Sequence, residues 1–246
     1  MMHQFLRRRL PGCSSVSPFL THLRFDSAQP AETLVYNEPP MFAGKNSLNA
    51  LKEIQLEVQR TGNHPLLFQK SGDFIAIYDQ FPKSKYHLLV IPRKAEYESI
   101  HAFDTSKRDD LRFLIEMIRF GDQIIHRTLK RIDPGRVFIS GFHSIPSLHP
   151  IHLHVMSVDL EGRAMRKKKH YNSFATSFFL ESHETLKKLL SGNRVDRIEH
   201  TSVDLQKVPM KCIWCDEGLE DISSWRNHAA GCRENLTSIS NTACFL

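Results

Sequence analysis

The sequence lacks any apolar run that approaches the roughly 20 residues of a transmembrane helix. It is also poor in cysteine, with five in 246 residues, and four of the five follow residue 211. An odd, clustered set in a chain of this length argues against a secreted disulfide scaffold. It favours a reducing compartment and a bound metal.

The N-terminal stretch has no acidic residue before Asp26, although it contains Arg7, Arg8, Arg9 and Arg24. This composition is typical of a mitochondrial transit peptide. The competing interpretation is a disordered basic tail. Because prolines recur and no apolar period is sustained, we expect residues 1–44 to be a disordered tail.

The chain as a whole is basic, with a net charge of +6 and an isoelectric point near 9.1. This charge indicates an acidic partner, with nucleic acid as the first candidate. A merely soluble basic protein is the alternative. The length suits one large domain, or a medium domain followed by a small one.

Apolar periodicity predicts the order α-β-β-α-β-β, an α+β fold with an antiparallel sheet and flanking helices. The predicted elements are a helix through Leu48 and Val58 capped by Asn46 or Ser47, strands 74–78 and 86–92, a helix from Thr105 or Ser106 to Arg131, and strands 136–141 and 151–156. A basic run, 166–170, and a short helix, 184–190, follow. We expect one domain over residues 45–190, a linker over 191–207 and a small domain over 208–246.

Four of the fourteen histidines fall within twelve residues, at His143, His149, His152 and His154. Side chains alternate between the two faces of a strand. In the strand 151–156, His152 and His154 therefore share one face, and the apolar residues between them share the other. Such a pair is able to bind a metal, bind phosphate or attack phosphorus.

Three interpretations of these histidines compete. A metal site lacks an Asp, Glu or Cys within the motif to complete it. A structural role is usual for a lone histidine, but four lie close together here. Nucleophilic catalysis needs a neutral imidazole, and other groups must neutralise the charge that develops on phosphate. Lys83, Ser147 and backbone N–H groups are candidates for that task.

The C-terminal part contains the pattern Cys-x2-Cys-x12-His-x3-Cys, formed by Cys212, Cys215, His228 and Cys232. Four soft ligands with this spacing predict a structural zinc site. Leu219 and Trp225 are expected to form its core, and Lys207, Lys211 and Arg226 to meet phosphate. Such fingers bind proteins as well as DNA, so the pattern alone leaves the partner open.

The segment 151–156 resembles the His-x-His-x-His motif of the histidine-triad superfamily, with Pro150 in place of the first histidine. Three blocks together resemble the aprataxin family: Gly141–Ser147, Arg166–Phe174 and the zinc-finger pattern. The resemblance extends from Leu48 to Cys232. It implies that His143 performs part of the role that Pro150 is unable to perform, and that His149 is a bystander.

This resemblance implies a role for each matching position. His152 would be the nucleophile, His154 would bind the phosphate and orient the nucleophile, and His143 would act at the leaving 5'-phosphate. Substrate contacts would come from Asp79 near the ribose, Lys83, His87 and Ser147 near phosphate, Lys168 and Lys169 along the DNA, and Leu48 against the terminal base pair. The zinc would be structural, with no catalytic metal.

The function that the resemblance implies is DNA repair. The enzyme would hydrolyse 5'-adenylated ends of nicked, double-stranded DNA through an adenylyl-histidine, releasing AMP without any membrane partner. This function implies a nuclear protein, and the basic N-terminus adds a mitochondrial pool as an alternative. Two other readings are a small-molecule histidine-triad hydrolase and a non-catalytic zinc-finger protein that binds nucleic acid.

Overall fold

A computed structural model describes residues 35–37, 48–94, 97–195 and 202–242, and in the last range it describes the side chains of residues 204–232. Most of the predicted tail and the predicted cap residues Asn46 and Ser47 lie outside these ranges. No helix within the described ranges is long and apolar enough to cross a membrane.

An antiparallel sheet of six strands forms the centre of the fold, in the order β1-β2-β3-β5-β4-β6. The strands are β1 (Leu67–Lys70), β2 (Phe74–Tyr78), β3 (His87–Pro92), β4 (Phe138–His143), β5 (Leu153–Ser157) and β6 (Phe179–Glu181). The predicted α+β class and the β2–β3 hairpin are confirmed. Strands β1 and β6 were missed, because β1 buries only Phe68 fully and β6 has three residues.

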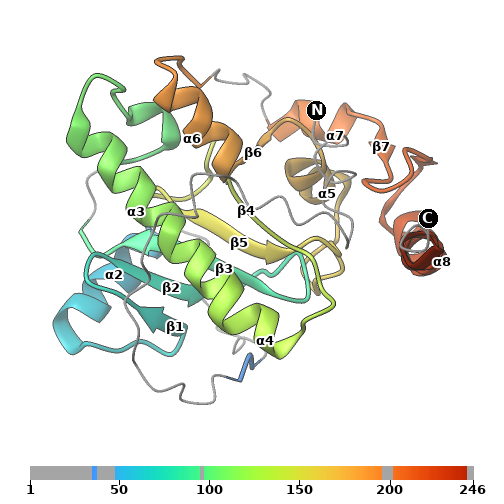
Figure 1. The fold of residues 1–246 in the computed structure, drawn as a ribbon, viewed down its shortest axis with the longest axis horizontal. Helices are drawn as coiled ribbons and strands as arrows, with labels where there is room; N and C mark the ends of the chain where they lie inside the picture. Colours follow the sequence, from blue (N-terminus) through green and yellow to red (C-terminus); the bar gives the residue numbers. More distant parts are fainter. Residues whose placement is uncertain (1–34, 38–47, 95–96, 196–201, 243–246) are drawn as a thin grey trace.

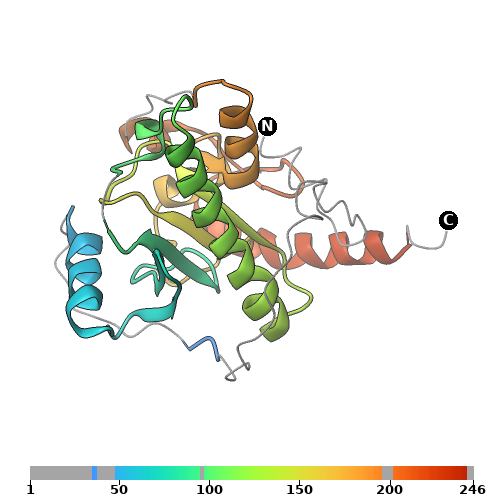
Figure 2. The same cartoon turned by 60° about the vertical axis from the view of Figure 1, so that its left-hand side comes forward.

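Helices flank this sheet. They are α2 (Ala50–Thr61), the 3-10 turn η2 (Ile100–Ala102), α3 (Arg108–Ile124), the π-helical turn η3 (Ile125–Leu129), α4 (Lys130–Ile132), α5 (Lys168–Ala175), α6 (Ser182–Leu190), α7 (Ser202–Lys207) and α8 (Ile222–Thr242). Figure 1 shows α3 passing in front of the sheet, and in Figure 2 α8 extends away from the body of the molecule. The short hairpin of β7 (Met210–Lys211) and β8 (Gly218–Leu219) precedes α8.

The first two helices begin later than predicted. Helix α2 starts at Ala50, so Leu48 precedes it and is 53% exposed. Helix α3 starts at Arg108, because Ser106 belongs to a turn in which its N–H donates to Asp104 Oδ1 over 3.0 Å. The predicted end of α2 is confirmed, since Gly62 adopts the left-handed conformation that closes a helix (φ 75°).

Two hydrophobic layers cover the two faces of the sheet. The layer under α3 contains Leu153 and Val155, as the alternation predicts. Gly121 allows α3 to approach closely, because a Cβ there would lie 2.8 Å from Leu153 Cδ2. The opposite layer joins Met156 of the sheet with Phe174 of α5 and with the apolar residues of the C-terminal part.

The segments predicted as a basic run and a linker contain helices. Helix α5 begins within the basic run at Lys168, and its apolar residues Tyr171 and Phe174 are buried. Helix α7 lies within the predicted linker 191–207 and packs on α5, where Asn172 Nδ2 donates to Leu205 O over 2.8 Å. A polar composition concealed both helices, because only their contacts with each other and with the sheet bury them.

Candidate active site and metal centre

Four histidines meet on the face of the sheet that α5 covers. The register of β5 against β3 and β4 places His87, His143, His152 and His154 on this same face. The His154 ring lies 4.4 Å from that of His143, 5.0 Å from that of His152 and 5.2 Å from that of His87, between centroids. The three histidines predicted to act together are therefore adjacent, and His87 joins them.

Hydrogen bonds determine which nitrogen of two rings carries the proton. The backbone N–H of Lys83 donates to His87 Nδ1 over 3.0 Å. A backbone N–H is only able to donate, so the neutral His87 ring carries its proton on Nε2. His87 Nε2 then donates to His154 Nδ1, 3.0 Å away. The proton of His154 therefore lies on Nε2, which is buried with no hydrogen-bond partner among the described residues.

The tautomer of His152 is also determined, and in the opposite sense. Its Nδ1 lies 3.1 Å from the carbonyl oxygen of Pro150, and a carbonyl only accepts. The proton of a neutral His152 is thus on Nδ1, and Nε2 offers a lone pair. The bond comes from the backbone of residue 150, so it needs no histidine side chain at that position.

Burial keeps these histidines uncharged. Desolvation lowers the pKa of His87 to about 4 and that of His143 to about 3. It also lowers the pKa values of His152 and His154. Each ring is therefore neutral at pH 7, which is the state that a nitrogen nucleophile or a neutral donor requires.

Asp79 lies beside this cluster. Its Oδ2 is 3.5 Å from His87 Nε2, and its Oδ1 accepts from the Phe81 N–H over 2.7 Å. Burial alone would raise the pKa of Asp79, but His87, Lys83 and the Phe81 N–H outweigh burial and lower it. The carboxylate is therefore ionised, and it favours the proton on His87 Nε2.

A metal is a second reading of Asp79, His87 and His154, whose ligand atoms lie within 4.8 Å of one another. The histidine motif itself contains no carboxylate, and the fold brings Asp79 to it from outside. The same residues also form a chain of hydrogen bonds, from Lys83 N–H to His87 and from His87 to His154. The proton on His87 Nε2 occupies the lone pair that a metal would need.

Helix α5 closes the site. The ring of Phe174 lies 4.7 Å from His143, 5.2 Å from His154 and 5.6 Å from His87, between centroids. Lys168 and Lys169 occupy the first turn of the same helix and are half-buried. Their charges and the N-terminal end of the helix dipole both favour an anion beside them.

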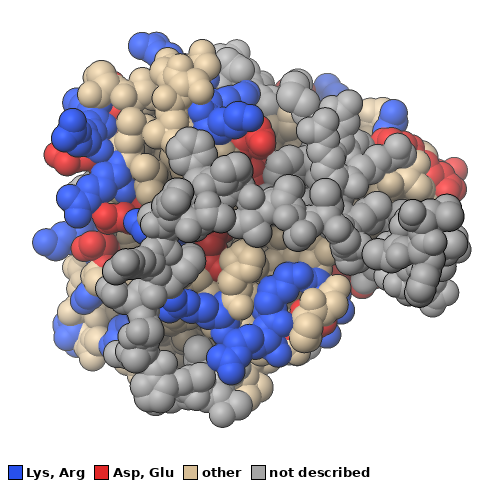
Figure 3. All heavy atoms as spheres, viewed as in Figure 1, with Lys and Arg blue, Asp and Glu red and all other residues tan. Residues whose placement is uncertain are grey.

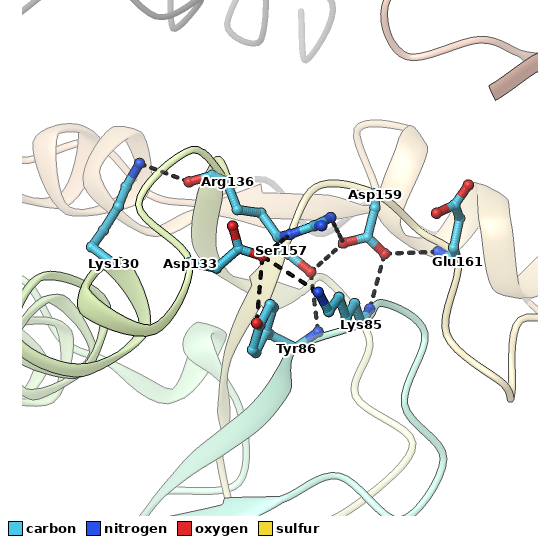
Figure 4. A network of polar contacts seen from close by, with 8 residues as sticks. All are labelled: Lys85, Tyr86, Lys130, Asp133, Arg136, Ser157, Asp159 and Glu161. Atoms are coloured by element: carbon cyan, nitrogen blue, oxygen red, sulfur yellow. Dashed lines mark hydrogen bonds and ion pairs between the residues drawn. The ribbon is translucent and has the colours of Figure 1, made fainter. Parts of the chain in front are cut away.

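Hydrogen bonds from the segment that follows β5 hold the loop that carries Lys83. Gly162 N–H donates to Lys83 O over 3.0 Å, and a Cβ at Gly162 would lie 2.2 Å from Pro82 O. Figure 4 shows Asp159 accepting from the N–H of Lys85, over 2.9 Å, and from Arg136 Nη1, over 3.3 Å. Asp159 is only 2% exposed, so this bracing lies inside the protein.

The remaining predicted contacts lie at the rim. Ser147 is exposed in the connection between β4 and β5. His149 N–H donates to Leu48 O over 2.9 Å, which ties this connection to the start of α2. Leu48 is exposed and therefore is not the core residue that an apolar side chain at a helix start usually is. The ring of His149 points elsewhere, with its Nδ1 3.3 Å from the carbonyl oxygen of Glu98.

The predicted metal ligands converge. The ligand atoms of Cys212, Cys215, His228 and Cys232 all lie within 4.8 Å of one another. Cys212 Sγ and Cys232 Sγ are 3.8 Å apart, and Cys215 Sγ is 3.3 Å from His228 Nε2. Tetrahedral zinc with bonds of about 2.3 Å to sulfur would separate two thiolates by roughly 3.8 Å, so the set fits this ion.

His228 is also oriented for a metal. Its Nδ1 lies 3.3 Å from Glu217 Oε2, which leaves Nε2 facing the thiolates. The predicted core residues Leu219 and Trp225 are buried. This cluster of four ligands would hold a structural ion, because it offers no open position for a substrate.

The segment from β7 to α8, which holds the four metal ligands and is called the finger below, shares a hydrophobic core with the face of the sheet that bears the histidines. Tyr171 Oη of α5 donates to Lys211 O over 2.9 Å, and Arg226 Nη2 donates to Met165 O over 3.0 Å. Arg226, whose contact with phosphate stays a prediction, also joins the two parts through this bond. Because Tyr171 and Phe174 belong to one helix, the finger supports the helix that covers the histidines.

The fold and the clustered histidines define a histidine-triad-like domain that is joined to a Cys3His cluster. The family model "Scavenger mRNA decapping enzyme C-term binding" matches residues 53–170. Aprataxin of Gallus gallus is 34% identical over 159 residues, which are 65% of this chain and 48% of that protein. Transcription factor bHLH140 of Arabidopsis thaliana is 31% identical over 187 residues, 76% of this chain and 20% of that protein.

Solved structures agree on the fold. The aprataxin orthologue Hnt3, in complex with DNA, superimposes with a TM-score of 0.58 at 21% identity, covering 77% of this chain and 96% of the other. In sequence, the chain is similar to the aprataxins of Gallus gallus and Danio rerio, at 34% and 31% identity over 65% of its length. It spans just under half the length of the Gallus gallus aprataxin.

Acidification should destabilise the protein through the buried histidines. Because the pKa of folded His87 is lowered from 6.5 to about 4, the unfolded state binds more protons between these values. The stability from His87 is thus complete above pH 6.5 and is lost as the pH falls toward 4, by roughly 2 kcal/mol at pH 5. Urea unfolding at several pH values measures this slope. His87→Gln should flatten it and exposed His126→Gln should not, whereas equal slopes in all three proteins would contradict the assignment.

Zinc removal should disturb the finger selectively. Both tryptophans of the chain, Trp214 and Trp225, lie there, so their fluorescence reports on it alone. We expect one zinc per chain, and a red shift of emission when a chelator removes the ion. Cys215→Ser should lose the zinc, and Cys244→Ser should keep it. A wild-type protein that is purified with excess zinc and still binds none would contradict the prediction.

Proposed function

We propose that the protein hydrolyses 5'-adenylated DNA ends and releases AMP and a 5'-phosphate. The observation that carries the proposal is the opposite protonation of two neighbouring rings. His152 offers a lone pair on Nε2, and His154 offers an unsatisfied N–H on Nε2. A nucleophile beside a donor is the arrangement that attack on a phosphate ester requires. Sequence similarity to the aprataxins, and the DNA bound by Hnt3, support DNA as the substrate.

The first step forms a covalent intermediate. His152 Nε2 attacks the phosphorus on the adenosine side of the pyrophosphate, and the bond from this phosphorus to the bridging oxygen breaks. The DNA leaves with its 5'-phosphate, and AMP stays on His152. The ring then carries positive charge, which the bond from Nδ1 to Pro150 O stabilises. Water next attacks the same phosphorus, and the bond from this phosphorus to His152 Nε2 breaks. AMP leaves, His152 is neutral again, and the proton that the water loses passes to solvent.

Other groups neutralise the charge on the phosphates. His154 Nε2–H would donate to an oxygen of the attacked phosphate, held by its bond from His87. His143, whose Nε2 is also buried without a described partner, would contact the leaving 5'-phosphate. In the protein without substrate, the pKa of His143 is about 3. His143 would therefore act as a neutral hydrogen-bond donor until a bound phosphate raises this pKa. These donors make a catalytic metal unnecessary in the proposal.

The DNA would approach from the side of Lys83, Lys168 and Lys169, with Ser147 and Leu48 at the rim. The face over α3 is a poor alternative. Figure 3 shows basic and acidic side chains side by side at the left edge of this view. Arg112 pairs with Glu116 on α3, and Lys107 pairs with Asp104 just before it. Paired charges produce little net field for a phosphate backbone.

Replacement of the nucleophile tests the chemistry. His152→Ala should abolish AMP release from 5'-adenylated nicked DNA, lowering the rate at least about a thousandfold, while DNA binding persists. A label on the adenylate should appear on the wild-type protein in acid-sensitive form and not on the variant. His149→Ala is the matched control and should keep the activity. Turnover by His152→Ala would refute the assignment.

Charge variants distinguish a DNA enzyme from a hydrolase of small adenylates. Lys168→Ala with Lys169→Ala should weaken DNA binding and lower the slope of log K against log salt by up to about 2. Hydrolysis of a small adenosine phosphoramidate should be unchanged. Lys187→Ala with Lys188→Ala, which removes the same charge from exposed positions of α6, is the control. Equal effects of the two double variants on DNA affinity would favour a hydrolase of small adenylates. DNA binding by a wild-type protein that releases no AMP would favour a non-catalytic protein that binds nucleic acid.

A further inference from the structure

A short segment before the sheet lies against strands that are distant in the sequence. Tyr36, within the described residues 35–37, packs its ring among three aromatic rings of the β1–β3 region. The centroid distances are 4.7 Å to Tyr86, 5.2 Å to Tyr78 and 6.3 Å to Phe68. These contacts place the Tyr36 hydroxyl beside the first residue of β3.

The hydroxyl of Tyr36 contacts the backbone of His87 and no part of its ring. It accepts from His87 N–H over 2.9 Å and lies 3.5 Å from His87 O, to which it donates. Burial raises the pKa of Tyr36, so the hydroxyl keeps its proton and both contacts persist at neutral pH.

His87 lies opposite Met156 of β5. The neighbouring pair is the hydrogen-bonded one, because Ser157 N–H donates to Tyr86 O over 3.0 Å, so the N–H of His87 points away from β5. On the other side, the register of β2 and β3 ends at Tyr78 and Leu88, one residue before His87. Asp79 N–H reaches the carbonyl of His87 over 3.2 Å, but it is a donor and leaves the N–H of His87 unsatisfied. Because His87 has no solvent exposure, the loss of the Tyr36 hydroxyl would leave a buried N–H without a partner.

We propose that Tyr36 is a positioning residue for the active site, and that its hydroxyl acts as a clamp on the backbone of His87. The proposal rests on the proposed function. The hydroxyl fixes the backbone of His87, His87 Nε2 fixes His154 Nδ1, and His154 Nε2–H is thereby directed at the substrate phosphate. Tyr36 thus acts on the reaction through two rings without touching the substrate.

The clamp should affect the tautomer of His154 and not that of His152. His152 is held by Pro150 O, which lies outside the chain of bonds from Tyr36. Loss of the clamp should therefore leave the nucleophile in place and weaken the stabilisation of charge on the phosphate. The adenylyl-histidine should still form, but more slowly.

Tyr36→Phe tests this inference, because it keeps the ring and removes only the hydroxyl. We expect kcat for AMP release to fall about tenfold or more, with KM changed less than about twofold. The reason is that the hydrogen bond from His154 Nε2–H, which the clamp positions, stabilises charge in the transition state. Tyr86→Phe is the matched control. It removes a hydroxyl from the same aromatic cluster, but that hydroxyl reaches Asp133 over 3.4 Å.

Imidazole NMR supplies a readout that is independent of activity. With ¹⁵N-labelled histidine, wild-type His154 should show the proton on Nε2, and Tyr36→Phe should show exchange between the two tautomers. The control should resemble the wild type. An unchanged His154 tautomer in Tyr36→Phe, or equal losses of kcat in both variants, would overturn the proposal. If the wild type releases no AMP, the proposed function fails, and the NMR comparison still decides whether Tyr36 positions His154.

Discussion

One backbone hydrogen bond determines the tautomers of His87 and His154, two of the four clustered histidines. The N–H of Lys83 donates to His87 Nδ1, and this single contact sets the proton on His87 Nε2 and then on His154 Nε2. Without this bond, each ring could adopt either tautomer, because in a pair of hydrogen-bonded neutral imidazoles either ring can be the donor. The position of the Lys83 loop is therefore the constraint from which the proposed phosphate site follows.

Much of the surrounding structure serves to hold that loop. Asp159 binds the N–H of Lys85 from inside the protein, and Gly162 lies so close to Pro82 that no larger side chain fits. The carboxylate of Asp79 reinforces the same protonation from the other side of His87. These contacts come from separate parts of the chain, and each restricts the same short stretch of backbone.

The C-terminal finger belongs to the same physical unit. Its Trp225 packs at 5.0 Å from Tyr171, and Tyr171 lies one helical turn before Phe174, which covers the histidines. Deletion of the finger would therefore expose part of the core under α5, and loss of DNA affinity would be confounded with damage to the catalytic face. For this reason point variants on α5 are cleaner tests of DNA binding than truncation.

The sequence by itself determined the main elements of the fold and the candidate chemistry, because these depend on local spacing. Alternation in the strand 151–156 placed His152 and His154 on one face, and the Cys-His spacing predicted a closed set of ligands. The resemblance to a known family implied the role of His143. The polar helices α5 and α7 escaped prediction, because only tertiary packing buries them.

Only the tertiary structure decided how these residues work together. Tyr36 lies beside the backbone of His87, and Asp79 and His87 lie beside His154. These places result from strand register and loop position, which no local pattern encodes. The same holds for the carbonyl of Pro150. Pro150 replaces the first histidine of the triad motif, yet its backbone carbonyl accepts the hydrogen bond that determines the tautomer of His152. A side-chain pattern is unable to reveal a role that the main chain performs.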